Sequence, residues 1–368
     1  MARQRQSTPG LVVAFTLLGA CSSDAGGATV TSSSTSTAAA SATTSATATS
    51  TTPPTPAAST ATGSTTVPAT TVPATAMPAT AVPATAVPAP TTIRIVSQNI
   101  LHGQNCPTES GGCQLTDRIA VFIQQLADAG CPEIVAIQEA NAEVAALFGE
   151  HLEPCGYTLV WDGDPGPDRE LVLTTQHAIE TRRVALVGGE RDAFVTRLDT
   201  QVGAIELFTT HLASGRDNGP CDACPPPCDP AGELRECQAR QVLDAVGQSA
   251  TSDIVVVAGD FNATPGEPTH QLVVDAGLVA SHLVAGRPEC GPDHPLMCTA
   301  GRDDRSMADM TDPGSRQTGR IDYIFVGADR CQIGDATGPF NAEPAQGAIA
   351  YPSDHTGIMT ELVCSNGL

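Results

Sequence analysis

Six short stretches of the chain place acidic, amide or imidazole side chains at the ends of runs that have strand character. Four of these runs end in such a residue, namely Asn99, Glu139, His211 and Asp260, the last followed by Asn262. Two other runs begin with one, at Asp322 and at Asp354-His355. If all six stretches lie at one edge of the fold, the last two strands run opposite to the first four. The sequence then predicts mixed sheets with one polar cleft along that edge.

These residue types suit the hydrolysis of a phosphoester. Carboxylate and amide oxygens are the ligands that Mg²⁺ or Mn²⁺ prefers, so Glu139, Asp354 and Asn99 are candidate metal ligands. A hard cation neutralises phosphate oxygens and the charge that develops on the leaving oxygen, while a base takes a proton from the attacking water. Each histidine needs a partner that fixes its tautomer, and Glu170 and Asp322 are available for that.

The elements that position these residues follow from the hydrophobic pattern of residues 93 to 368. Ten apolar runs predict strands at 93–98, 134–138, 158–161, 171–175, 182–187, 193–198, 204–210, 254–258, 321–326 and 355–363. Three helices are predicted: one that begins near Thr116 as N-cap, one over 233–249 and one over 270–276. Ten strands with few helices predict an α/β fold, a layered sandwich of two packed mixed sheets flanked by helices.

Six motifs in this order resemble the endonuclease/exonuclease/phosphatase superfamily, which has the deoxyribonuclease I-like fold. The resemblance covers essentially all of residues 93 to 368. The motifs are Ser97-Gln98-Asn99, Ile137-Gln138-Glu139, Thr210-His211-Leu212, Gly259-Asp260-Phe261-Asn262, Arg320-Ile321-Asp322-Tyr323 and Ser353-Asp354-His355.

The resemblance implies a role for each residue of the metal and water sites. Glu139 would ligate Mg²⁺ or Mn²⁺, with Asn99 close by and Asp354 helping directly or indirectly. Asp260 would position or deprotonate the attacking water, and Asn262 would orient that water and the phosphate.

The resemblance also implies partners for the two histidines. His355, paired with Asp322, would contact the scissile phosphate as an acid/base or charge stabiliser. The stretch Arg169-Glu170-Leu171-Val172 is similar to the part of deoxyribonuclease I whose glutamate supports a histidine, which here pairs Glu170 with His211.

The charge of the chain restricts its substrates. The 368 residues include 40 acidic and 18 basic side chains, all 18 of them arginine, with a formal net charge of −22. This balance argues against a broad basic surface that grips a polyanion through many phosphates. A local basic patch is still compatible with this net charge. Five arginines that could contact phosphates are expected near the cleft: Arg216, Arg302, Arg305, Arg316 and Arg320.

The N-terminal region predicts export and a lipid anchor. Two arginines precede a short apolar run at 11–18, and Leu18-Gly19-Ala20-Cys21 resembles a bacterial lipobox. We therefore predict a signal peptide over 1–20 and a lipidated Cys21. Residues 21–92 are predicted to be a disordered Ser/Thr/Ala/Pro-rich stalk, with five-residue repeats from Val67, and residues 93–368 the folded domain. The expected location is the cell surface or periplasm, anchored to a bacterial membrane.

The remaining cysteines indicate an oxidising compartment. Twelve of the 13 lie between Cys106 and Cys364, and an even number in an exported chain predicts disulfides. A cluster of four, at 221, 224, 228 and 237, also has the short spacing of a zinc or iron–sulfur site. Three consecutive prolines inside the cluster and the oxidising exterior favour a surface loop closed by disulfides.

Three functions remain open at this point. The first is a surface-anchored, metal-dependent nuclease, favoured slightly by the residues around Asp260 and Asp354. The second is a sphingomyelinase-like or small-molecule phosphoesterase, which an acidic enzyme suits well. The third is a catalytically inactive binding module on a stalk. The presence of both histidines and all the acidic residues argues against this function. A monomer is expected in each case.

Overall fold

The computed structural model describes residues 90–364 except for 103–105, 107–110, 165, 189–190, 222–223, 225–227, 229–231, 250–251, 304–306 and 328–330. The predicted signal peptide, Cys21 and most of the predicted stalk lie outside these residues, as does Arg305. The chain divides into two units, Met1–Thr80 and Ala81–Leu368, and all that follows concerns the second. Within the described residues, no helix combines the length and the apolar character needed to cross a membrane.

The first sheet contains the N-terminal and C-terminal strands of the domain. In the described part of the chain it consists of β1 (Thr91–Asn99), β2 (Ile134–Ala140), β3 (Thr158–Val160), β4 (Arg169–Thr174), β11 (Cys331–Ile333), β12 (Gly338–Pro339) and β13 (Ile358–Cys364). The order is β11-β13-β1-β2-β4-β3, with β12 beside β13. β1 runs parallel to β2 and antiparallel to β13.

The second sheet is formed by the strands between them in sequence. It consists, within the same residues, of β5 (His177–Ala185), β6 (Asp192–Thr200), β7 (Gly203–His211), β8 (Ile254–Asp260), β9 (Val279–Ala280) and β10 (Asp322–Gly327). The order is β5-β6-β7-β8-β10-β9. β7 runs parallel to β8, and β10 runs antiparallel to β8, so this sheet is mixed like the first.

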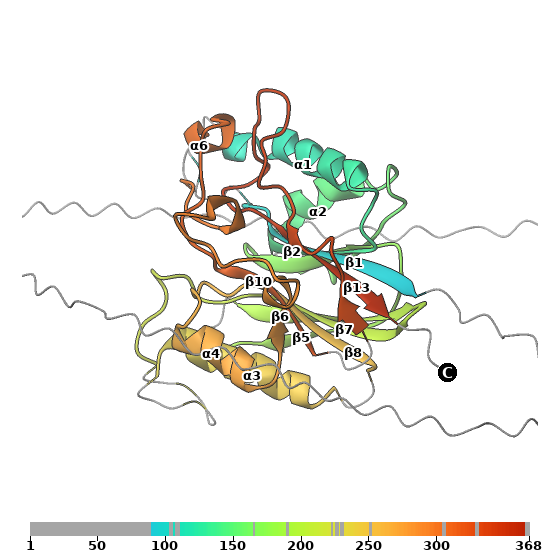
Figure 1. Ribbon diagram of the computed structural model, residues 1–368, viewed down its shortest axis with the longest axis vertical. Helices are drawn as coiled ribbons and strands as arrows, with labels where there is room; N and C mark the ends of the chain where they lie inside the picture. The colour runs from blue at the N-terminus through green and yellow to red at the C-terminus, as the bar shows by residue number, and fades with distance from the viewer. Residues whose placement is uncertain are drawn as a thin grey trace, which may run out of the picture. The chain divides into compact units, whose positions relative to one another are not determined.

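The two sheets pack face to face between two layers of helices (Figure 1). The first sheet is covered by α1 (Gly111–Asp128) and α2 (Ala142–Gly149), and the second by α3 (Leu234–Gly247) and α4 (Pro268–Asp275). Short helical turns are α5 (Ser281–Val284), α6 (Ala308–Thr311) and a 3₁₀ turn at Pro295–Met297. The predicted layered α/β sandwich with two mixed sheets is confirmed.

Three apolar layers hold the sandwich together: one between the two sheets, and one between each sheet and the helices that cover it. Between the sheets, Ile93 and Ile95 of β1 lie in one fully buried cluster with Val256 of β8 and Ile324 of β10. Each such side chain contributes roughly 1.5–3 kcal/mol when it leaves water. On the outer face of the first sheet, the predicted apolar side of α1 is buried, and Phe122 makes edge contacts with two other rings.

All ten predicted strands are present, but several boundaries and short elements differ from the prediction. Helix α1 begins at Gly111 rather than near Thr116, although Cys113 and Gln114 have positive φ angles, of 54° and 53°. The last strand begins at Ile358 because His355 lies in the turn before it. The missed elements are α2, α5, α6, β9, β11, β12 and the 3₁₀ turn, which have two to eight residues each, so a periodic pattern gives only a weak signal in them.

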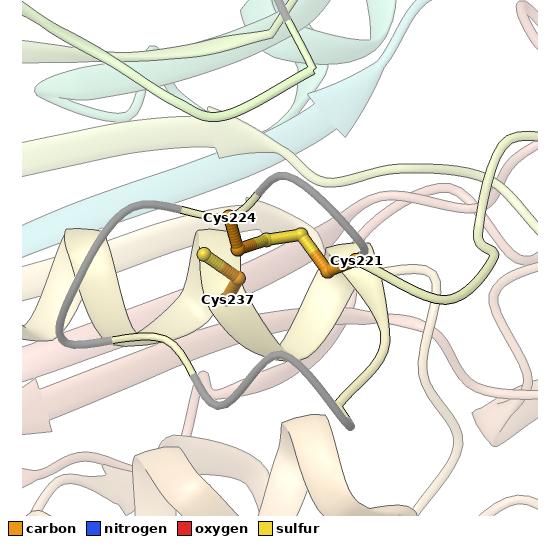
Figure 2. Close-up of side chains that lie close together, drawn as sticks. All are labelled: Cys221, Cys224 and Cys237. Atoms are coloured by element: carbon orange, nitrogen blue, oxygen red, sulfur yellow. A yellow bond between two sulfur atoms is a disulfide. The ribbon is translucent and has the colours of Figure 1, made fainter.

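All twelve described cysteines form disulfides, and each pairs with the next cysteine along the chain. The pairs are Cys106–Cys113, Cys131–Cys155, Cys221–Cys224, Cys228–Cys237, Cys290–Cys298 and Cys331–Cys364. The predicted disulfides are therefore confirmed, and the four clustered cysteines form two of them. Figure 2 shows Cys237 of this cluster beside the Cys221–Cys224 bond.

The disulfide Cys331–Cys364 is expected to stabilise the domain most among the six, because it closes the longest segment. Its cysteines are 33 residues apart and face each other across β11 and β13. Replacing both by alanine should lower the free energy of unfolding by about 3–4 kcal/mol, from the entropy of loop closure. Urea unfolding measures this. The matched control is Cys221→Ala with Cys224→Ala, three residues apart, and an equal loss in that control would contradict the account.

Candidate active site

The predicted polar residues converge on one edge of the sandwich. The C-terminal ends of β1, β2, β7 and β8 lie there together with the start of β10 and the turn at Ser353-Asp354-His355. A cleft of about 600 Å³ opens at this edge. Its charged and polar lining includes His102, Glu139, Asp168, Arg191, His211, Arg216, Asp260, Asn262, Asp354 and His355. The convergence that the sequence predicted is thus confirmed.

The carboxylate of Asp260 lies at the centre of the group and is only 1% exposed. Its Oδ2 is 3.2 Å from Asn99 Nδ2, 3.4 Å from His211 Nε2 and 3.9 Å from His355 Nε2. Burial and the neighbouring charge of Asp322 raise the pKa of Asp260, whereas the two histidines oppose this shift. A buried carboxylate with a raised pKa is a stronger base than an exposed one.

A glycine allows this arrangement. Gly259 has a φ of +152°, and a Cβ atom at this position would lie 1.8 Å from the carbonyl oxygen of Thr210 on β7. Only glycine therefore fits where β7 and β8 approach each other. In the resulting parallel register His211 is directly opposite Asp260.

His355 is held by Asp322, as predicted. Its Nδ1 is 2.9 Å from Asp322 Oδ2 and 3.1 Å from Oδ1. Burial favours the neutral ring, but the charges of Asp322 and Asp354 outweigh it and raise the pKa of His355 well above its ordinary value. The imidazolium form is thus favoured at neutral pH, with Nε2 directed to the side of Asp260.

His211 is held by Asp168 and not by Glu170, so the predicted pair of Glu170 with His211 is wrong. Asp168 Oδ1 is 3.2 Å from His211 Nδ1, and Arg191 contacts both groups. Burial opposes ionisation of Asp168, but His211 and Arg191 outweigh it and lower its pKa to about 2. Asp168 lies just before β4, at the cleft, whereas Glu170 is the second residue of the strand and lies in the interior.

Glu170 instead lies inside the domain, fully buried, beside Asp192 and 3.8 Å from Arg183. Burial and the charges of Asp192 and Asp168 raise the pKa of Glu170 well above its ordinary value. Within the described residues neither of its oxygens accepts a hydrogen bond. This side chain belongs to the interior and not to the cleft.

The predicted metal ligands lie close to Asp260, which Asn99 contacts directly. Asn99 Nδ2 is 3.0 Å from Glu139 Oε1, while its Oδ1 accepts a hydrogen bond from the backbone amide of Leu101. Asn99 therefore presents its amide nitrogen to the carboxylates in this arrangement. Glu139 has a φ of 57° at a register shift in β2, and this bulge turns its side chain into the cleft. Asp354 is fixed by Ser353, whose Oγ lies 3.0 Å from Asp354 Oδ1.

Asn262 completes the group next to Asp260. It has a φ of 49°, and its backbone amide donates to Asp260 Oδ1 at 2.8 Å. Its side-chain Nδ2 donates to the carbonyl of Leu212 at 3.0 Å, and it lines the cleft.

Several residues in and around the cleft were not evident from the sequence. His102 lies in the cleft, with Nε2 3.7 Å from Glu139 Oε2. Arg118 of α1 is fully buried and donates to four backbone carbonyls, those of Ile100, Leu101, Cys113 and Pro352. It thereby joins the end of β1 to the turn that carries Asp354, and no local pattern distinguishes such an arginine from an exposed one.

The predicted arginines near the cleft are mostly structural. Of the four that the structure describes, Arg216 lines the cleft. Arg302 is buried against the ring of Tyr351, and Arg320 is 1% exposed and donates to the carbonyl of Met297. Arg316 donates to carbonyls of its own loop. Arg191, which the sequence pattern did not single out, is the second arginine that lines the cleft.

The family model for the endonuclease/exonuclease/phosphatase family matches residues 96–355. The chain belongs to this family. Members of the family are generally phosphoester hydrolases that use a divalent metal ion, typically Mg²⁺. No curated protein matches the chain.

Solved structures of the family share the fold. A truncated TDP2 from Caenorhabditis elegans has a TM-score of 0.54 at 15% identity, over 74% of this chain and 98% of that one. A family protein from Bacteroides thetaiotaomicron has a TM-score of 0.55 at 17% identity, over 75% and 98%. A Danio rerio TDP2 complexed with a single-strand DNA product has a TM-score of 0.53 at 21% identity, over 74% and 98%.

The carboxylates of the cleft fit the divalent cation that this family uses. Burial raises the pKa of Asp354 to about 6, and the charge of Glu139 adds to this, although His355 and Arg118 oppose it. Carboxylates that disfavour each other's ionisation are stabilised when a cation lies between them. Glu139 and Asp354 are the residues that would hold it, and Asp260, Asp322 and His355 also have ligand atoms within 4.8 Å of one another.

Glu170→Gln tests the assignment of Glu170 to the interior. Because the pKa of Glu170 is raised in the folded state, the native protein binds more protons than the unfolded chain above the ordinary value of 4.5. Its stability should therefore fall as pH rises through this window, by at most about 1.4 kcal/mol per pH unit from this group. The Glu170→Gln variant lacks this loss, so it should gain on the wild type as pH rises.

Urea unfolding between pH 4 and pH 8 measures the difference. The exposed Glu180→Gln is the control and should follow the wild type. If the Glu170→Gln variant and the wild type kept the same pH profile, the buried, proton-binding state of Glu170 would be ruled out.

Proposed function

We propose that this protein is a metal-dependent phosphodiesterase, with nucleic acid as the favoured substrate. The observation that carries the proposal is the shared carboxylate of Asp260, which lies beside two imidazoles that each have their own acidic partner. A base flanked by two oriented proton carriers, facing Glu139 and Asp354, is suited to in-line attack of water on a phosphodiester.

Each side chain has a part in this reaction. Asp260 accepts a proton from the attacking water, which Asn262 orients. His355, kept cationic by Asp322, contacts the phosphate oxygens and stabilises their growing charge. His211, with its Nδ1 side held by Asp168, has Nε2 available to exchange a proton at the phosphate. The divalent ion, when bound by Glu139 and Asp354, supplies charge neutralisation for the phosphate and the leaving oxygen.

The cationic groups of the cleft support a nucleic-acid substrate. Arg191 and Arg216 both line the cleft and suit bidentate contact with phosphate. The D. rerio TDP2 that shares the fold was crystallised with a single-strand DNA product. Two arginines are enough to contact a few phosphates next to the scissile bond. Such a short contact does not require a broad basic surface, so it is compatible with the net charge of −22.

Nicking of supercoiled plasmid by residues 90–368, which include all of β1, with disulfides intact, tests the proposal. We expect nicking in Mg²⁺ or Mn²⁺ and none in EDTA. His355→Ala should reduce the rate by about 10²–10⁴-fold, the usual contribution of a positioned acid or base. Glu180→Gln, which lies outside the lining of the cleft, serves as the control variant.

A thermal-shift titration with the metal accompanies the assay and separates the possible failures. A folded, metal-binding protein that leaves plasmid intact would exclude the nuclease and move the proposal to a small phosphodiester. A protein that binds no metal would exclude hydrolysis and favour a binding module.

A small phosphodiester, such as a sphingomyelin-like headgroup, is the second candidate. The observation that favours it is the strong negative charge of the chain, which repels a long polyanion. Added salt distinguishes the two, since contacts to several phosphates weaken steeply with salt and turnover of a small substrate does not.

We also propose that the domain is anchored to a bacterial membrane through Cys21. The support is the sequence: a signal peptide over 1–20, the lipobox-like run before Cys21, and a stalk that leads to the domain. The stalk is two residues shorter than predicted, because β1 of the domain begins at Thr91 and pairs there with Cys364. Disulfides throughout the domain are consistent with an oxidising exterior. Cys21→Ser should release active protein from the membrane fraction, and retention of the variant with membranes would contradict the anchor.

A further inference from the structure

Asn262 is held by an arginine from outside the predicted catalytic group. Its carbonyl accepts a hydrogen bond from Nη1 of Arg235, the second residue of α3. Arg235 is 9% exposed, and it does not belong to the lining of the cleft. Together with the bonds to Asp260 and Leu212, this contact fixes both ends of the Asn262 backbone and its side-chain nitrogen.

This third contact has a structural reason. Asn262 has a φ of 49°, in the left-handed region that residues other than glycine adopt uncommonly, although asparagine does so more often than most. Contacts that hold both its backbone groups stabilise this conformation. A charged donor to its carbonyl is the stronger kind of hydrogen bond, and this one is partly buried. Arg235 therefore stabilises the conformation that turns Asn262 into the cleft beside Asp260.

The first turns of α3 hold Arg235 in place. Its backbone amide donates to Asn218 Oδ1 at 3.0 Å, and the amide of Leu234 donates to the carbonyl of Gly219 at 2.9 Å. One turn later, Gln238 Oε1 accepts from the amide of Ala213 at 2.7 Å. The start of the helix is thus fastened to the chain that leaves His211.

Two disulfides strengthen the same turn. Cys237 lies two residues after Arg235 and is bonded to Cys228, and the Cys221–Cys224 bond lies directly beside it (Figure 2). The amide of Cys221 also donates to the carbonyl of Gly232 at 3.0 Å. The cysteines that the sequence presents as a cluster thus lie around the base of the helix that carries Arg235.

We propose that Arg235 is a positioning residue for Asn262, and that the disulfide-bonded turn around Cys237 serves to hold it. The proposal rests on the proposed function, in which Asn262 orients the attacking water. Arg235 acts through Asn262 and does not touch the substrate.

A double-mutant cycle tests this in the full disulfide-bonded domain. Arg235→Met should lower kcat for bis-p-nitrophenyl phosphate and for plasmid by about tenfold or more with little change in KM, as expected for a misplaced group. Arg235→Lys should recover part of this loss, because a lysine can still donate to the carbonyl. In an Asn262→Ala background, Arg235→Met should have no further effect. Independent, multiplicative losses would overturn the proposal.

A measurement that needs no activity accompanies the cycle. Hydrogen exchange of the Asn262 backbone amide, which donates to Asp260, should accelerate by about tenfold in Arg235→Met. Arg240→Met is the matched control, since it removes an arginine from the same helix, and it should leave this amide unchanged. Unchanged exchange in Arg235→Met would overturn the proposal. If the wild type hydrolyses neither substrate, the proposed function fails, and this exchange still decides the role of Arg235.

Discussion

The buried carboxylate of Asp260 is the group on which the rest of the site depends. Asn99 reaches it from the first sheet, and His211 reaches it from the neighbouring strand of its own sheet. Its position relative to the predicted metal ligands therefore depends on how the two sheets pack. That packing is apolar and non-directional. The hydrogen bonds at this edge fix the relative orientation of the side chains, which the apolar packing does not specify. Gly259 allows β7 and β8 to approach each other closely.

The sequence was sufficient to predict the layered sandwich and most of the site because the decisive signals are local. A polar residue directly after an apolar run marks where a strand leaves the core, as at Glu139 and Asp260. The requirement that all such residues share one edge then sets the strand directions, which the antiparallel β10 and β13 confirm. The spacing of motifs along the chain carried this information without any knowledge of side-chain contacts.

The sequence could not predict how deeply a side chain is buried, nor the contacts between residues that are distant in the chain. Asp168 lies just before β4 and Glu170 within it, so the residue at which the strand begins decides which of the two acids supports His211. Arg118 and Arg235 were missed for another reason: their partners are backbone carbonyls, which leave no trace in the pattern of residue types. Groups that hold catalytic residues in place are therefore harder to find than the catalytic residues themselves.

The pairing of each cysteine with its next neighbour has a consequence for how the protein is made. A chain that crosses a membrane from its N-terminus exposes its cysteines one after another, and the native partner of each is always the next to emerge. Twelve cysteines allow a very large number of pairings, and pairing in the order of emergence would select the native set. On the proposed route of export, such a chain would have little need of an isomerase to correct its disulfides.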